Sequence, residues 1–397
     1  MNRRNDHPAS PAPLRPAARR ASSMPRSAIR EIMAMAAGRP DVIHLEVGEP
    51  DFGTPGDITE RAFEAVRAGA TRYTPNAGMP RLRELVAGRV AARTGAAVTA
   101  AEIVITTGAI GALFTALNVV VDAGDEVLVP DPGWPNYESI LHLAGATPLR
   151  YTMRPDNAFL PDLDEVERLI GPRTKAILLN SPGNPSGAVF PQAVMERFGT
   201  IARRHGVYLI SDEIYEDIVF EGEPVSALSV APADRVLLIS GVSKSYAMTG
   251  WRLGWMVAPA QLAALGAGLQ EPVTSCPAAP SQAAAMAALA GPQDEVFRFR
   301  DIFKRRRDIV EEVFRGTGLL PFVPRGAFYA LIDIGRSGRD SLSFAKDLLI
   351  RDNVATVPGI TFGPSCENFV RVAFTTEDRK LRTGLERLRD RLLASDG

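Results

Sequence analysis

The chain has 397 residues, which is longer than one ordinary domain and suits about two. Hydrophobic residues make up 46% and charged residues 23%, as in soluble globular proteins, and the net charge of −1 gives no global field that would attract nucleic acid or a membrane surface. The two cysteines, Cys276 and Cys366, exclude a disulfide framework and a CxxC metal site, and no apolar run reaches the roughly 20 residues of a membrane span. Composition therefore predicts a soluble, cytoplasmic protein with a large core.

The first 25 residues differ from the rest of the chain. Residues 8–20, PASPAPLRPAARR, show no hydrophobic periodicity and bury too little apolar surface to offset the entropy of ordering. We therefore predict a disordered N-terminal arm over residues 1–25, which could still pack on a partner subunit. Its arginines are typical of a transit peptide, but its prolines would break the amphipathic helix that such signals form, which favours a flexible arm.

From about residue 100, short apolar runs alternate with helical stretches. The runs are rich in Val, Ile and Leu and too short for buried helices, as expected of strands covered on both faces; they lie at 103–106, 126–130, 175–180, 207–212 and 235–240. Helical patterns separate most of the runs, at 109–121, 136–144 and 192–205. The alternation predicts βαβ units and a mostly parallel sheet, whose ligands bind beyond the carboxyl ends of the strands.

The C-terminal part has a different pattern. Two long charged amphipathic segments, 294–314 and 378–393, flank shorter apolar pieces at 327–333 and 369–374. This mixture predicts a smaller α+β domain. We expect the early segment 41–47 to fold back into it.

Small residues follow the first apolar run. Between that run and the next helical stretch, residues 106–111 read TTGAIG, which leaves backbone N–H groups open at the positive end of a helix dipole. Such a turn can bind a phosphate group. The signal is weak alone, because tight turns also use glycine for packing and the segment fits neither the Walker pattern nor GxGxxG.

The later strand ends carry side chains suited to a flat polar ligand. Trp134 could stack on a ring, although core packing is the commoner role of an aromatic residue, and Asn184 lies in the stiff loop SPGNPSG. Asp212 ends a buried strand, where a carboxylate needs a partner, and we expect a positively charged one. Lys244 follows the last run, and lysine is rarely buried without reason. A phosphate seat, a ring, an amide, a carboxylate and an amine together meet the needs of pyridoxal phosphate (PLP).

Three ordered motifs carry a resemblance to a known family. SPGNPSG at 181–187, SDEIY at 211–215 and GVSKSYAMTGWRLG at 241–254 resemble the signature of class I/II aminotransferases of PLP fold type I, the group similar to aspartate aminotransferase. The resemblance runs from about residue 40 to the C-terminus. It also covers VGEPDF at 47–52, RYTPNAGMPRLRE at 72–84, PGITFG at 358–363 and RVAFTT at 371–376.

The resemblance implies a fold and a domain organisation. The fold is α/β, with a mostly parallel seven-stranded sheet in a large domain and a smaller α+β domain. The implied parts are the disordered arm 1–25, an N-terminal segment 26–50 that packs with the small domain, a large PLP-binding domain 51–290 and a small C-terminal domain 291–397. The family also implies a homodimer with shared active sites.

The resemblance further implies the residues that bind the cofactor. Lys244 holds PLP as an aldimine and moves the substrate proton, Asp212 keeps the pyridine nitrogen protonated, and Tyr215 and Asn184 donate to the phenolic oxygen. Trp134 lies on the ring face. The phosphate is held by Gly108, Ala109, Ile110, Ser243 and Arg252, together with Tyr73 from the neighbouring subunit. Some relatives bind phosphate with a hydroxyl three residues before the lysine, where this chain has Gly241.

The substrate is expected to bind beside the cofactor. The resemblance implies that Arg371 grips its α-carboxylate, assisted by the Gly48 amide and Asn184. Ile110 occupies a position where some dicarboxylate-specific relatives carry lysine. Isoleucine offers no salt bridge to a distal carboxylate, so the resemblance weakly disfavours a donor range restricted to aspartate. The expected partners are an amino acid and a 2-oxo acid, without nucleic acid or membrane. No metal is expected, since the four histidines lack ligand spacing.

The implied activity is an aminotransferase that moves the amino group of an L-amino acid to a 2-oxo acid, with 2-oxoglutarate as the expected acceptor, by a ping-pong mechanism. The first alternative is a carbon–sulfur lyase or another enzyme that eliminates a β or γ group with the same lysine. A second alternative is a PLP-sensing regulator. A regulator would need a DNA-binding module, and a proline-rich arm is no helix-turn-helix.

Overall fold

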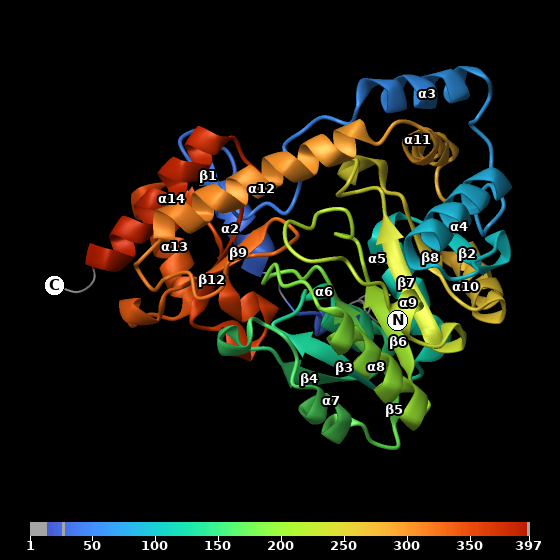
Figure 1. Ribbon diagram of the computed structural model, residues 1–397, viewed down its shortest axis with the longest axis horizontal. Coiled ribbons are helices and arrows are strands. Elements are labelled where there is room, and N and C mark those ends of the chain that lie inside the picture. Colours follow the sequence, from blue (N-terminus) through green and yellow to red (C-terminus); the bar gives the residue numbers. More distant parts are fainter. Residues whose placement is uncertain (1–13, 26–27, 395–397) are drawn as a thin grey trace, which may run out of the picture.

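The structure is a computed structural model that describes residues 14–25 and 28–394 (Figure 1). Its centre is a seven-stranded sheet in the order β2-β8-β7-β6-β5-β3-β4, which confirms the predicted α/β fold. These strands are β2 (Ile103–Thr106), β3 (Glu126–Asp131), β4 (Thr147–Thr152), β5 (Thr174–Asn180), β6 (Tyr208–Asp212), β7 (Val236–Gly241) and β8 (Gly254–Val257). The α-helices of the described residues are α1 (Arg19–Ser22), α2 (Ala28–Ala36), α3 (Gly56–Arg67), α4 (Pro80–Thr94), α5 (Gly108–Val120), α6 (Asn136–Ala144), α7 (Leu163–Leu169), α8 (Gln192–His205), α9 (Ala227–Val230), α10 (Ala260–Thr274), α11 (Ala279–Ala290), α12 (Asp294–Phe314), α13 (Ser341–Asp352) and α14 (Asp378–Leu393).

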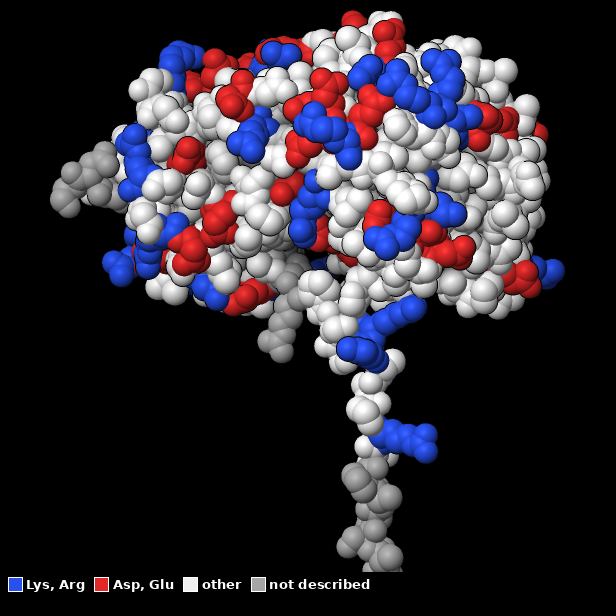
Figure 2. Space-filling view, turned by 90° about the horizontal axis from the view of Figure 1, so that it is seen from below, with Lys and Arg blue, Asp and Glu red and all other residues white. Residues whose placement is uncertain are grey.

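Residues 14–25 of the N-terminal arm are described, and the disorder predicted for residues 1–25 stays a prediction. Residues 19–22 form the helical turn α1, and the Arg20 guanidinium donates to the Leu143 carbonyl of α6 at 3.0 Å. A cation is favoured there because the carbonyls at the C-terminal end of a helix are partly negative. Figure 2 shows the rest of the described arm projecting from the body of the molecule, with basic side chains on it. Residues 1–13 lie outside the described residues.

Strand direction brings the carboxyl ends of most strands to one edge of the sheet. The strands from β4 through β3, β5 and β6 to β7 are parallel neighbours. β8 is antiparallel to both β7 and β2, so β2 runs in the same direction as β7. The predicted runs therefore end at a common edge. β4 and β8 had no counterpart among the predicted strands.

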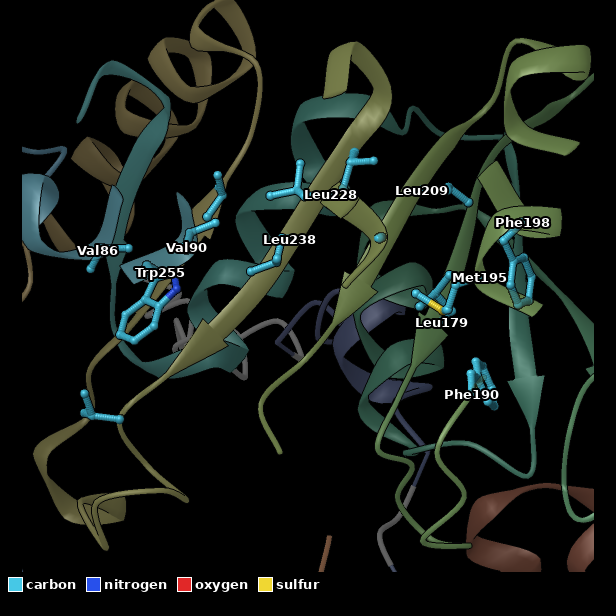
Figure 3. Packing of buried hydrophobic residues seen from close by; sticks show 14 of the residues in the cluster. Val86, Val90, Leu179, Phe190, Met195, Phe198, Leu209, Leu228, Leu238 and Trp255 are labelled. Atoms are coloured by element: carbon cyan, nitrogen blue, oxygen red, sulfur yellow. The ribbon is translucent and has the colours of Figure 1, made fainter. Parts of the chain in front are cut away.

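Helices cover both faces of the sheet, so alternate strand residues enter two separate cores. In β5, Ile177 and Leu179 pack into one core while Ala176 and Leu178 pack into the other. Figure 3 shows the first core, where Met195 and Phe198 of α8 lie against strand residues. Because both faces of these strands are buried, their sequences are continuous apolar runs and do not alternate with polar residues.

The C-terminal part forms its own sheet and core. β11 (Val357–Pro358), β12 (Phe369–Ala373) and β9 (Tyr329–Asp333) form a three-stranded antiparallel sheet beside α12, α13 and α14. β1 (Ile43–His44) pairs in parallel with β10 (Val354–Ala355), so the early segment does fold back as expected. Figure 1 shows α12 running from this region towards α11 and α3. The domain limits at residues 51, 290 and 291 stay a prediction. No helix in the described ranges is long and apolar enough to cross a membrane.

Candidate active site

A cavity of about 580 Å³ lies where the carboxyl edge of the large sheet meets the C-terminal sheet. Most of the predicted site residues line it: Gly48, Ala109, Ile110, Trp134, Asn184, Asp212, Tyr215, Ser243, Lys244, Arg252 and Arg371. Gly108 lies beside it, against Arg252, and Tyr73 lies outside it. The structure therefore brings together residues from seven segments of the sequence.

One end of the cavity is built to receive an anion. Gly108 has a φ of +75°, and a Cβ there would lie 2.7 Å from Nη2 of Arg252, so the guanidinium packs directly on the turn before α5. The N-terminus of α5 has no side-chain cap among the described residues, so its N–H groups remain available there. A Cβ on Gly254 would lie 2.5 Å from the Ala109 nitrogen, which explains glycine at the start of β8. This end fits a phosphate group.

Gly241 also has a steric explanation. A Cβ there would lie 2.8 Å from the Cα of Gly254, so a larger residue would push the two strands apart. The hydroxyl that some relatives carry at this position has no room here. Ser243, which is buried and lines the cavity, remains the predicted hydroxyl donor of the turn.

Asp212 is buried at the end of β6, where two hydrogen bonds from the protein hold its carboxylate. Tyr137 donates its hydroxyl to Oδ2 at 2.8 Å, and the Ile214 amide donates to Oδ1 at 3.3 Å. Burial raises the pKa of Asp212 to about 6, although the Tyr137 hydrogen bond and the Lys244 charge lower it. A cationic N–H group bound in the cavity would lower the pKa of Asp212 further and hold it ionised.

Lys244 follows β7 and reaches across to the N-terminal segment. Its Nζ donates to the Gly48 carbonyl at 2.8 Å. Burial lowers the pKa of Lys244 to about 8, and the nearby charges of Arg252 and Arg371 act in the same direction. An appreciable fraction of the amine is therefore unprotonated near neutral pH, as a nucleophilic lysine requires.

Arg371 of β12 is buried and held from several sides. Its Nη2 donates to the Glu46 carbonyl at 2.6 Å and its Nη1 to Asn184 Oδ1 at 3.2 Å. The guanidinium carbon lies 4.4 Å from the ring centre of Tyr329 and 5.1 Å from that of Phe362. Nε is buried and has no hydrogen-bond partner among the described residues. The guanidinium is therefore held in place and still has N–H groups that can donate to a ligand. Such an arrangement suits a carboxylate.

Trp134 and Tyr73 occupy very different environments. Trp134 lines the cavity and meets Tyr137 edge to face, with ring centres 5.6 Å apart, so a ring face is available for stacking. Tyr73 is 90% exposed and takes no part in the cavity of its own chain. Its predicted role in a neighbouring subunit stays a prediction.

Several cavity residues escaped the sequence prediction. Ile29 and Met33 of α2 form an apolar part of the wall, and Glu46 precedes the predicted Gly48. Tyr137 lies in the same WPNY stretch as Trp134, which was the available signal for it. Tyr329 gave no signal, because an aromatic residue in an apolar run is typical of a core. Among the described residues, no cluster of three or more His, Cys, Asp or Glu side chains could hold a metal ion.

Comparison with known proteins gives a consistent set of relatives. Residues 40–388 match the sequence model of the family Aminotransferase class I and II. The chain is 39% identical over 350 residues to aspartate/prephenate aminotransferase of Thermus thermophilus, covering 87% of this chain and 90% of that protein. It is 37% identical over 350 residues to an arginine–pyruvate transaminase of Pseudomonas aeruginosa, covering 88% and 89%. The structure of Thermus thermophilus aspartate aminotransferase with maleate matches with a TM-score of 0.91 and 37% identity, over 95% of this chain and 100% of that chain.

Proposed function

The chain belongs to the class I and II aminotransferases, and we propose that it uses PLP, held around Lys244, to move the amino group of an L-amino acid to a 2-oxo acid. The names of its relatives support amino-group transfer and give no support to the eliminating lyase. Amino acids and 2-oxo acids are accordingly its substrates. The proposed reaction is ping-pong, with 2-oxoglutarate as the acceptor.

The observation that carries the proposal is the set of chemical groups that one cavity brings together. The Gly108 turn and Arg252 suit a phosphate, Trp134 offers a ring face, Asp212 suits a cationic ring nitrogen, and Lys244 suits an aldehyde. The residues present therefore fit PLP. When bound, PLP supplies an electron sink for the negative charge that develops at the substrate α-carbon.

Each protein group has a separate task in the proposed chemistry. The Lys244 amine removes the proton from the substrate α-carbon and returns a proton at the end of the transfer. Asp212 keeps the proton on the cofactor ring nitrogen, and Tyr215 and Asn184 donate hydrogen bonds to the phenolic oxygen. Arg371 grips the substrate α-carboxylate, while the Gly48 amide assists, so the α-proton is presented to Lys244.

The cavity wall supports a donor range wider than aspartate. Ile29, Met33 and Ile110 place apolar side chains along it, and Ile110 offers no salt bridge to a distal carboxylate. The test is a screen of amino donors with 2-oxoglutarate, in which glutamate formation is measured. Donors with apolar side chains should support glutamate formation, and a protein active with aspartate alone would contradict this part of the proposal.

We propose a homodimer, and the exposed apolar surface supports it. Tyr73 is 90% exposed, and its neighbour Thr74 donates its amide to Cys276 Sγ, just beyond α10, at 3.4 Å. α10 itself exposes large apolar side chains, with Leu265 54% and Val273 62% exposed. Large apolar side chains left exposed on one helix and on a segment bonded to the chain just beyond it are typical of an interaction surface. On this surface Tyr73 would reach the phosphate held by the partner subunit.

Shared sites make a specific prediction for mixed dimers. Tyr73→Phe should weaken PLP retention, because the phosphate loses a donor. Tyr73→Ala and Lys244→Ala proteins, dissociated and reassociated together, should form heterodimers with one doubly damaged site and one intact site. Such heterodimers should recover about half of wild-type activity. Confirmed heterodimers without recovery would show that each chain builds its own site.

The proposal also covers location and other partners. Cys276 and Cys366 are both unpaired, which is typical of a reducing compartment, and we place the protein in the cytoplasm. Figure 2 shows acidic and basic side chains mixed across the visible face, in keeping with the net charge of −1. We propose no nucleic-acid or membrane partner, since such partners usually require a basic surface.

A further inference from the structure

Tyr329 has no role in the proposed chemistry, yet it touches three residues that do. Its hydroxyl oxygen lies 2.9 Å from that of Tyr215, and its ring centre lies 4.4 Å from the guanidinium carbon of Arg371. The backbone of Gly48 passes directly over the hydroxyl, so that a Cβ on Gly48 would collide with it. The buried side chain of Tyr329 thus contacts Arg371, which is proposed to bind the substrate carboxylate, and Gly48, whose carbonyl accepts from Lys244. It also contacts Tyr215, which is predicted to donate to the cofactor.

The fold fixes Tyr329 firmly in this position. It is the first residue of β9 and pairs with Ala373 of β12, the strand that also carries Arg371. The side chain is 2% exposed and packs on Phe328, with ring centres 4.8 Å apart. Tyr215 comes from the loop after β6, so the pair of hydroxyls joins the C-terminal sheet to the large sheet. Few other rotamers are open to so tightly packed a ring.

The number of protons decides the direction of the hydrogen bond. Each hydroxyl carries one proton, and Tyr215, which lines the cavity, must direct its proton at the cofactor's phenolic oxygen to act as a donor. The bond between the two tyrosines then requires the proton of Tyr329. We propose that Tyr329 is a positioning residue, which donates to the Tyr215 oxygen, frees the Tyr215 proton for the cofactor and couples this bond to the occupancy of Arg371. This inference rests on the proposed PLP chemistry.

The charge on Arg371 supplies the coupling. A cation over a phenol ring withdraws electron density and makes the hydroxyl a better donor. Burial raises the pKa of Tyr329, and the charge of Arg371 opposes that rise. Asp212 and Arg371 are the charged groups that act on Tyr215 from the other elements around it. A substrate carboxylate on Arg371 would offset its charge, weaken the Tyr329 donor and so weaken the Tyr215 donor in turn.

The test is a pH titration of the visible absorbance of PLP bound to the wild type and to Tyr329→Phe. Phenylalanine keeps the ring under Arg371 and removes only the hydroxyl group, and with it the donated proton. The midpoint should rise by about half to one pH unit, the effect of one neutral hydrogen bond. A saturating carboxylate ligand, for which maleate is the first choice, should raise the wild-type midpoint, and this rise should be smaller in Tyr329→Phe. KM for the amino donor should change less than kcat.

Two further variants make the result specific. Tyr151→Phe is the matched control, because Tyr151 is equally buried, donates to the Leu178 carbonyl at 2.9 Å and does not line the cavity. Its midpoint should equal that of the wild type. The double variant Tyr215→Phe with Tyr329→Phe should have the same midpoint as Tyr215→Phe alone. Tyr329 acts on the cofactor only through the Tyr215 hydroxyl, so its loss adds nothing once that hydroxyl is gone.

The outcomes separate this inference from the proposed function. A wild-type protein that binds no PLP at Lys244 would overturn the proposed function. A wild type that titrates and transfers amino groups normally, beside a Tyr329→Phe protein with the same midpoint and the same maleate response, would overturn only the inference. Equal shifts in Tyr329→Phe and Tyr151→Phe would also overturn it, since the effect would then belong to any lost buried hydroxyl.

Discussion

Replacing Lys244 with alanine should lower kcat for amino-group transfer by more than about 10⁵-fold and should leave PLP bound noncovalently, if it binds at all. The reason is that one amine both attaches the cofactor and moves the α-proton. Among the described residues that line the cavity, Lys244 is the only lysine, so no second lysine there can replace it. Steady-state turnover gives the rate. Borohydride reduction followed by peptide mass measurement locates the covalent cofactor.

The control for this variant is Lys175→Ala. Lys175 lies on β5, its side chain is 47% exposed, and its Nζ is 3.9 Å from Asp125, so its loss should leave turnover unchanged. The wild-type apoprotein should also capture PLP faster as pH rises and level off above about 8, because the neutral amine is the reactive form and the pKa of Lys244 is lowered to about 8. Wild-type turnover in purified Lys244→Ala protein would rule out the mechanism.

Replacing Asp212 with alanine should reduce the rate of a single turnover by about 10³- to 10⁵-fold while PLP still attaches to Lys244. Asp212 is only 5% exposed, so its charge acts on the ring nitrogen with little screening by water. That interaction strengthens as negative charge moves into the ring, and the loss should therefore appear in kcat. Rapid-mixing absorbance measurements with saturating donor provide the rate.

Glu213→Gln is the matched control for Asp212→Ala. Glu213 is the adjacent buried carboxyl group, but it accepts from Ser211, Ser226 and the Ala227 amide and does not line the cavity. Its replacement should change the rate by less than about tenfold. In the wild type, PLP affinity should fall as pH drops through about 6, because protonation of Asp212 removes the partner of the ring nitrogen. Equal single-turnover rates for Asp212→Ala and the wild type would refute the assigned role.

Much of the fold could be predicted because local pattern and tertiary burial agree. The helical stretches predicted at 136–144 and 192–205 have the observed bounds of α6 and α8, and the amphipathic segments 294–314 and 378–393 have those of α12 and α14. β4 was missed because it is an edge strand whose residues are mostly half-buried or exposed, so it lacks an apolar run. β8 was missed because it has four residues next to a glycine-rich loop. The turn α1 was missed because its order comes from polar contacts with α6.

The site could be predicted in part for a geometric reason. Trp134, Asn184 and Lys244 each follow a strand, and parallel strands bring such residues to one edge. Arg371 and Gly48 come from the C-terminal sheet and the N-terminal segment, and only the family resemblance pointed to them. Their place over the cavity depends on tertiary packing that no local pattern encodes.

The buried tyrosines mark the limit of sequence reasoning at this site. Burial of Asp212 predicted a cationic partner, but it gave no indication of the Tyr137 hydroxyl that also binds the carboxylate. Tyr137 and Tyr329 both sit in apolar surroundings, where an aromatic residue usually serves packing alone. Only the position of the hydroxyl group distinguishes a tyrosine that packs in a core from one that donates a hydrogen bond at the site. That position depends on the fold.

A single half-reaction tests the central claim most directly. The purified protein is loaded with PLP and mixed with an amino donor in the absence of any 2-oxo acid. Our account predicts one equivalent of 2-oxo acid and one of pyridoxamine phosphate per subunit, without free ammonia, followed by recovery of PLP when 2-oxoglutarate is added. Continuous ammonia release with the cofactor unchanged would indicate elimination and contradict the account, as would the absence of conversion with every donor.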